Sequence, residues 1–492
     1  MRFRHFLLFA ALSAVSVSIY VALAALGGQA GFPLDDAWIH QTYARNFAES
    51  GQLAYVPGEP SAGSTSPLWT LLIVTGYKVN LDYRLWTYLL GALSLALCAW
   101  FVARLSQRLW PDRHGLAFAV GVTCVFEWHL AWAAASGMET TLFAALSLAA
   151  IDRAFAADQI GLRDGLIFGG LGGLLTSTRP EGLLVLVLAG SARIARPAVT
   201  ARVQFVLAAI GAFVVITFPA AWLNWQGSGT PFPNTFYAKQ QEYAIYFSSL
   251  STWLPRALDV VGAPFVGGQV LLVPGLLFES VSLLRTLRDR ACWVRMLPFV
   301  WIGLHLTVYA TRLPVTYPHG RYLMPIVPAI VLLGLHGTWR LATSHRKMPR
   351  SQLAWRVGVG SLIGAMVAFW IVGAGAYRVD VDIIEKELVA SARWTALNTS
   401  PEDLIAAHDI GAMGYFSRRP LLDLAGLISP EVIPIMRDEE ALLELLRRRR
   451  AAYFAAPPDF YARLTSVPEF ERVFAGNSPF TRNHWQIYRT GW

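Results

Sequence analysis

Long apolar runs decide how this chain can fold. The first, residues 6–26, follows Arg2, Arg4 and His5 and is about 21 residues long, enough to span a bilayer at 1.5 Å per residue. A signal peptide is the alternative, because residues 27–30 are small and polar, but the apolar core of a signal peptide is shorter. We therefore expect this run to be a retained transmembrane helix.

Further apolar runs follow along most of the chain. They are centred near residues 85–103, 115–134, 140–157, 165–178, 182–195, 203–224, 264–284, 297–311, 322–341 and 357–377. The composition also indicates a membrane protein, since 55% of residues are hydrophobic. Only 15% of residues are charged, whereas about 25% are charged in an average soluble protein. The sequence predicts a polytopic α-helical membrane protein with about 11 transmembrane helices.

One apolar segment, residues 67–79, is too short to count among the spans. It is about 13 residues long and carries Lys78, so we predict an interfacial or re-entrant helix. Counting it as a span would also move the arginine-rich loop at residues 104–113 to the opposite side. An odd number of spans then places the two chain ends on opposite sides.

Lysine and arginine are unequally divided between the predicted loops. If the N-terminus faces the cytoplasm, the inner loops hold more than twice as many of these residues as the outer loops do. Such an excess is typical of the cytoplasmic side. We predict a multi-pass protein of the inner (plasma) membrane with a cytoplasmic N-terminus. The net charge of +9 is then a topology signal, and no nucleic-acid partner is expected.

Residues 378–492 differ in composition from the rest. They contain 30 of the 73 charged side chains. Helical patterns occupy residues 383–397 and 438–450, and strand patterns lie near 404–408, 420–424, 452–455 and 485–488. The sequence therefore predicts a membrane module over residues 1–377, followed by an extracytoplasmic α/β domain over residues 378–492.

Two adjacent carboxylates, Asp35 and Asp36, stand in the first predicted outer loop, residues 28–66. Mutual repulsion and partial desolvation would raise the pKa of at least one of them. That suits a general base or a metal ligand. The alternative is that one aspartate caps a helix beginning at Ala37. The spacing alone leaves both interpretations open.

Other polar residues recur at the predicted outer ends of the spans. They are His40, Arg45, Ser64, Ser66, Glu139, Arg179, Glu181, Asn234, Lys239, His319, Arg321 and Tyr322. Charges at membrane depth are costly and usually face a cavity or a partner. Structural alternatives remain, because Arg179 and Glu181 could pair and Ser66 could cap a helix that starts at Pro67. As a set, these residues predict a pocket for an anionic, amphipathic substrate.

An ordered series of short motifs resembles the GT-C superfamily of membrane glycosyltransferases, including bacterial arabinofuranosyltransferase-type proteins. The motifs are Leu34-Asp35-Asp36-Ala37, Ser64-Thr65-Ser66-Pro67-Leu68-Trp69, Ser136-Gly137-Met138-Glu139-Thr140, Arg179-Pro180-Glu181-Gly182, Pro233-Asn234-Thr235-Phe236-Tyr237-Ala238-Lys239 and Arg321-Tyr322-Leu323-Met324-Pro325. The segment His408 to Gly414 also resembles a loop of such tail domains, where a turn and an acceptor contact are both open interpretations.

The resemblance implies roles for individual residues. Asp35 would deprotonate the acceptor hydroxyl, and Asp36 would orient the acceptor or hold a metal. Lys239 and Arg321 would contact the phosphate of a polyprenyl-phosphate-linked sugar donor. Family members that use monophosphate donors are described as metal-independent, so we expect no metal site and no cofactor. The resemblance leaves open whether a divalent metal is required.

The chemistry agrees with these roles. A polyprenyl phosphate is a good leaving group, so one base and positive charge opposite it are sufficient. Without a carboxylate nucleophile the displacement is single and inverts the anomeric carbon. The expected partners are the lipid bilayer, the lipid-linked donor and a glycan, lipid or protein acceptor of the envelope. A lipid-linked sugar transporter or flippase is the alternative, although the polar residues gather at one face instead of at the midplane.

Overall fold

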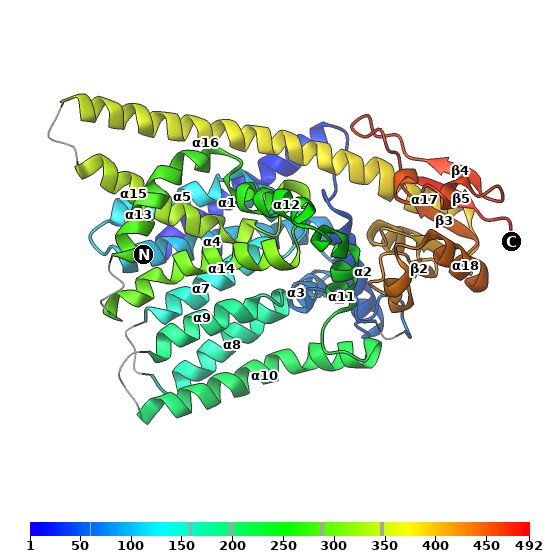
Figure 1. Ribbon diagram of the computed structural model, residues 1–492, viewed down its shortest axis with the longest axis horizontal. Coiled ribbons are helices and arrows are strands. Elements are labelled where there is room, and N and C mark those ends of the chain that lie inside the picture. The colour runs from blue at the N-terminus through cyan, green and yellow to red at the C-terminus, as the bar shows by residue number, and fades with distance from the viewer. Residues whose placement is uncertain (60, 157–159, 196–199, 286–289, 345–348) are drawn as a thin grey trace.

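The computed structural model describes residues 1–59, 61–156, 160–195, 200–285, 290–344 and 349–492. Long helices lie roughly along one direction and form the body of the molecule (Figure 1). The C-terminal domain, with all five strands of the described sheet, sits at one end, and the N-terminus lies at the other end (Figure 1).

Six helical segments in the described residues are long and apolar enough to cross a membrane. Their helices are α1 (Phe3–Leu26), α4 (Tyr83–Leu109), α10 (Thr200–Ser228), α14 (Leu297–Arg312), α15 (Val327–Ser344) and α16 (Pro349–Ile383). Two bent pairs raise the number to eight if each is one span. The chain is therefore a polytopic helical membrane protein, as the sequence predicts.

The sequence predicts one of the two bent pairs better than the other. The run near residues 115–134 forms α5 (His114–Val125) and α6 (Trp128–Ala135), which meet at 52°. The break occurs where the Glu127 carboxylate accepts the Leu130 N–H and caps α6. The second pair, bent by 89°, joins α12 (Leu250–Gly262) to α13 (Val273–Leu284). None of the predicted apolar runs covers α12.

Three of the predicted spans are short helices. They are α7 (Thr140–Ala154), α8 (Leu162–Thr178) and α9 (Gly182–Ile194). Glycines of α8 let α10 approach closely, since a Cβ at Gly165 would lie 2.4 Å from the Phe205 carbonyl oxygen. Small residues at such contacts provide the van der Waals packing that associates helices in a bilayer.

Three short helices lie between the long helices and the C-terminal domain (Figure 1). They are α2 (Asp35–Ser50), α3 (Pro67–Lys78) and α11 (Asn234–Glu242). Helix α3 occupies the segment predicted as interfacial, and α2 is buried from Ala37 to Asn46. The indole ring of Trp38 packs against Phe416 at 4.7 Å between ring centroids, which fixes α2 to the C-terminal domain.

The C-terminal domain is joined to the membrane module by continuous helix. Helix α16 passes through the predicted boundary at 377/378 and continues through Ile384–Val389 into α17 (Ala390–Asn398). The predicted boundary therefore marks a change in composition that falls within a continuous helix.

The sheet of this domain is mixed, with strand order β2-β1-β3-β5-β4. The strands are β1 (Ile405–Ala407), β2 (Leu421–Asp423), β3 (Tyr453–Ala456), β4 (Glu471–Ala475) and β5 (Gln486–Arg489). Strand β1 pairs in parallel with β2 and β3, and β5 runs antiparallel to β3 and β4. Helix α18 (Glu439–Arg449) buries Leu442 and Leu446 against β3 residue Phe454. The predicted α/β domain is confirmed, with β4 as an additional strand.

Candidate functional site

A cavity of about 580 Å³ lies beside α2 and α11, at the end of the membrane helices that faces the C-terminal domain. We call it the site cavity. Its polar lining comprises Asp36, His40, Thr65, Glu139, Arg179, Glu181, Thr235, Lys239, Gln240, Tyr309, Arg312, Arg321 and Tyr322. Apolar side chains complete the wall, and Leu183, Phe232 and Phe236 among them are exposed at the surface. The site cavity thus joins a polar end to an apolar, open side.

Asp36 and Arg321 form an ion pair at the polar end of this cavity. The guanidinium Nη2 of Arg321 donates to the Asp36 carboxylate, whose side chain is 37% exposed. Loss of hydration opposes ionisation of Asp36, but the positive charges of Arg321 and Lys239 outweigh it and hold its pKa below the ordinary value. Asp36 is therefore a stable anion and a weak base.

Asp35 is turned away from the cavity and toward the C-terminal domain. Its carboxylate accepts the backbone N–H groups of Gly411 at 2.6 Å and Ala412 at 2.8 Å. Loss of hydration and the nearby charge of Asp409 raise its pKa well above the ordinary value, and the two hydrogen bonds only partly offset this. Neither aspartate caps α2, because the cap position is Leu34. The capping interpretation is therefore wrong.

Tyr322 connects the two cations of the polar end. Its hydroxyl accepts hydrogen bonds from Lys239 Nζ and from Arg321 Nη2, the latter at 3.3 Å. Lys239 has no carboxylate partner within the described part of the chain. The buried Nε and Nη1 of Arg321 make no hydrogen bond to any described residue. Buried donors without an acceptor are rare, so this end of the cavity can take a further hydrogen-bond acceptor.

Arg179 sits in a second charged cluster on the wall of the site cavity. It contacts Glu181 Oε1 at 2.6 Å and Glu139 Oε1 at 3.0 Å, so the predicted Arg179–Glu181 pair is present. Loss of hydration would raise the pKa of Glu139, but the His40 ring, whose Nε2 lies 3.5 Å from Glu139 Oε2, and the charge of Arg179 lower it to about 2. Both carboxylates thus neutralise Arg179 and hold it in place.

Five predicted binding residues lie outside the lining of the site cavity. Arg45 donates to the Tyr415 carbonyl oxygen at 2.6 Å, and Asn234 donates to the Leu427 carbonyl oxygen at 3.1 Å. His319 contacts Asp380 Oδ2 at 2.7 Å, and Ser64 contacts Thr70 Oγ1 at 3.4 Å. Ser66 occupies the cap position of α3, but its side chain makes no capping hydrogen bond. The side chains other than Ser66 thus connect parts of the framework around the cavity, whereas the buried Ser66 Oγ has no hydrogen-bond partner among the described residues.

Three residues that sequence reasoning missed lie beside the charged groups of the site. Tyr309 donates to Glu181 and accepts from Arg179 Nη2 at 3.1 Å, but it stands within an apolar run and looks like a packing residue. Tyr317 lies 4.7 Å from Lys239 Nζ, measured to the ring centroid. Asp409 lies in the motif of residues 408–414; burial and the charge of Asp36 raise its pKa to about 7. In the sequence, only the resemblance of this motif to a loop of related tail domains indicated a role for Asp409.

Comparison with known proteins gives one partial family match. Residues 377–489 match a family described only as a domain of unknown function, DUF8728. No curated protein sequence matches the chain. The match covers the C-terminal domain and assigns no activity to it.

Solved structures of membrane proteins resemble nearly the whole chain. ArnT from Cupriavidus metallidurans bound to undecaprenyl phosphate has a TM-score of 0.60 at 15% identity and covers 98% of this chain and 97% of its own. The oligosaccharyltransferase AglB from Archaeoglobus fulgidus has a TM-score of 0.57 at 12% identity, covering 92% and 69%. The mycobacterial arabinofuranosyltransferase AftD has 0.54 at 14%, covering 100% and 42%. The chain therefore has the fold of the GT-C membrane glycosyltransferases.

Proposed function

We propose that this protein is an inverting glycosyltransferase that moves a sugar from a polyprenyl-phosphate-linked donor to an envelope glycan, lipid or protein. The observation that carries the proposal is the unsatisfied cationic end of the site cavity. Arg321 presents two buried donors without an acceptor, and Lys239 has no carboxylate partner among the described residues. A phosphate would satisfy both, since guanidinium binds it through paired donors and ammonium as a point charge.

The shape of the cavity suits the rest of such a donor. Leu183, Phe232 and Phe236 give it an apolar side that is open at the surface. A polyprenyl tail can leave through that side into the bilayer while its phosphate stays at Arg321. The similar structures support this use, because ArnT is bound to undecaprenyl phosphate and AglB is in complex with an inhibitory peptide and a dolichol-phosphate.

Asp35 serves as the base in this proposal. Its raised pKa makes it more basic than Asp36, which Arg321 holds as an anion. Asp35 lies outside the lining of the site cavity, so in this proposal the acceptor approaches it from the side of the C-terminal domain. Asp35 then takes the proton of the acceptor hydroxyl, whose oxygen forms the new bond to the anomeric carbon. The bond from that carbon to the phosphate oxygen breaks, and its electron pair passes to the phosphate beside Arg321 and Lys239. One displacement inverts the configuration. Asp36 orients Arg321 and the acceptor.

No step is assigned to a metal. Within the described residues, no group of three or more His, Cys, Asp or Glu side chains is placed to hold one. We further propose that the N-terminus is cytoplasmic and that the site cavity and C-terminal domain face the outside of the inner membrane. A reporter fused after Arg350 should then report cytoplasm, and one fused after Trp492 should report the exterior.

The decisive experiment measures transfer from a synthetic polyprenyl-phosphate sugar by the purified protein in detergent. Arg321→Gln and Lys239→Gln should weaken donor binding and slow turnover, by about 10²–10³ for Arg321, because negative charge grows on the leaving oxygen. Arg321→Lys should stay impaired, since one ammonium cannot make a bidentate contact. Arg256→Gln, on the exposed face of α12, is the matched control.

Two outcomes would contradict the proposal. Kinetics like those of the wild type in both Arg321→Gln and Lys239→Gln would remove the phosphate assignment. Movement of lipid-linked sugar across vesicles by the wild type, without any glycosidic product, would show a transporter instead. Thermal stability of each variant distinguishes loss of function from loss of fold.

A further inference from the structure

A second cavity, of about 360 Å³, lies at the opposite end of the membrane helices. We call it the arginine cavity. Arg321 lies shortly before α15, which begins at Val327, whereas Arg340 belongs to the last turns of that helix, which is about 27 Å long. The arginine cavity is therefore separated from the site cavity by the length of a membrane helix, and the proposed transfer reaction does not use it.

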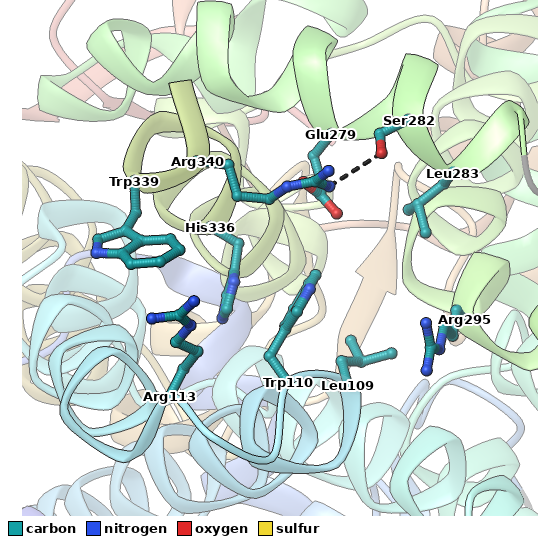
Figure 2. A pocket seen from close by; sticks show the side chains of 10 residues that line it. All are labelled: Leu109, Trp110, Arg113, Glu279, Ser282, Leu283, Arg295, His336, Trp339 and Arg340. Carbon is teal, nitrogen blue, oxygen red and sulfur yellow. Dashed lines mark hydrogen bonds and ion pairs between the residues drawn. The ribbon is translucent and has the colours of Figure 1, made fainter. Parts of the chain in front are cut away.

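Three arginines from separate parts of the fold converge on this cavity. Arg113 follows α4, Arg295 precedes α14, and Arg340 extends from α15 toward α13 (Figure 2). The one carboxylate in the lining, Glu279, is buried and is neutralised by Arg340 at 2.9 Å. Neither Arg113 nor Arg295 pairs with a carboxylate among the residues that the structure describes. Two positive charges thus remain unbalanced beside an open space.

Aromatic contacts hold this cationic site in shape. The Arg113 guanidinium lies 3.8 Å from the ring centroid of Trp339. The rings of Trp110 and His336 stack at 3.4 Å between centroids, and both line the cavity (Figure 2). Arg340 donates to Ser282 at 2.9 Å in addition to Glu279. Ring stacking and hydrogen bonds therefore hold Arg113 and Arg340 at the cavity, and Arg295 lies exposed at its edge.

We propose that the arginine cavity binds a phosphate group, and that this phosphate is the headgroup of an anionic phospholipid. Basic pockets between membrane helices suit such headgroups, and tryptophans are enriched at the level where headgroups lie. Helix α13 also favours a lipid over a free phosphate. It brings Ser282 to the cavity, while its Leu277, Val281 and Leu284 are exposed and can pack against acyl chains.

The test uses the full-length protein and measures retained lipid by native mass spectrometry. The protein is exchanged into mixtures of phosphatidylglycerol and phosphatidylcholine, and we expect the wild type to retain phosphatidylglycerol preferentially. Each arginine near an anionic headgroup should contribute about fivefold to that preference, so Arg113→Gln with Arg295→Gln should reduce it about 25-fold. Arg163→Gln, an exposed arginine on α8, should leave it unchanged.

Competition with inorganic phosphate identifies the source of the phosphate. If inorganic phosphate does not displace phosphatidylglycerol, the ligand is a lipid headgroup, as proposed. If inorganic phosphate displaces phosphatidylglycerol from the wild type, the cavity takes a soluble phosphate compound and the lipid assignment is overturned. Equal retention of both lipids by the wild type, a result that needs no variant, overturns the proposal itself.

Discussion

Asp35 and Asp36 are neighbours in the chain but occupy opposite electrostatic surroundings. Asp36 meets Arg321 and Lys239 and has a lowered pKa, whereas Asp35 meets two backbone N–H groups and the charge of Asp409 and has a raised one. The first turn of α2 produces this difference, because successive residues on a helix point in directions about 100° apart. One aspartate can therefore act on the acceptor while the other holds the cation at the donor.

Replacing Asp35 tests the base directly. Asp35→Asn should lower the rate of transfer by about 10²–10⁴, since a positioned base contributes that much, and should leave donor binding nearly intact. Asp36→Asn should instead weaken donor binding, because Arg321 loses its partner. Single-turnover rates and donor affinity measured on both variants separate these effects. If Asp35→Asn transfers the sugar as fast as the wild type does, Asp35 is not the base.

The pH dependence of transfer should report the coupling between Asp35 and Asp409. The base must be deprotonated, so activity rises with pH through the raised pKa of Asp35. Asp409→Asn removes a negative charge that contributes to this raised pKa. The acidic limb of the pH–rate profile should therefore move to lower pH. Asp459→Asn, at an exposed position in the same domain, should leave the profile in place. An unmoved limb in Asp409→Asn would exclude the coupling.

At the scale of elements, the apolar runs predict the membrane helices well because a span needs only length and hydrophobicity. Eight of the site residues predicted from the sequence line the site cavity. The sequence is less informative where an element depends on the elements packed against it. Helix α12 carries the charged residues Arg256 and Asp259 and contains no apolar run. Strand β4 has a register irregularity between Arg472 and Phe474, which hides the alternation of apolar and polar residues typical of a strand.

The contact between α8 and α10 provides a matched pair of glycines. A Cβ at Gly169 would lie 2.0 Å from the Ala209 carbonyl oxygen, whereas a Cβ at Gly170 would lie no closer than 3.9 Å to its nearest neighbour, Ile216. Gly169→Ala should destabilise the protein by about 1–3 kcal/mol through overpacking. Gly170→Ala should be neutral or stabilising, because alanine favours the helix. Thermal unfolding in detergent should rank them in this order, and equal stability would contradict the contact.

At the scale of the whole molecule, the C-terminal domain is part of the candidate site. Its Gly411 and Ala412 bind Asp35, and the Tyr55 hydroxyl of the membrane module donates to the Ile410 carbonyl oxygen at 2.5 Å. Composition predicts that this domain exists, but contacts between residues more than 350 positions apart leave no periodic signal in the sequence. Its contribution to the environment of the base therefore appears only in the structure.

A single methyl group at the contact between the two parts should test this contribution. A Cβ at Gly411 would lie 2.0 Å from the Asp35 carbonyl oxygen and 2.7 Å from its Oδ2, so Gly411→Ala must displace either the loop or the base. Because Arg321 and Lys239 stay in place, donor binding should persist while turnover falls by about 10²-fold, as expected for a misplacement on the order of 1 Å.

Gly375→Ala is the control for this substitution, since a Cβ on that residue of α16 meets nothing within 4 Å. Its turnover and donor affinity should match those of the wild type. If Gly411→Ala also retains full turnover, the C-terminal domain is a passive neighbour of Asp35. If it loses donor binding and turnover together, the domain supports the whole cavity and not the base alone. Selective loss of turnover is the result that requires the domain to position Asp35 for proton transfer.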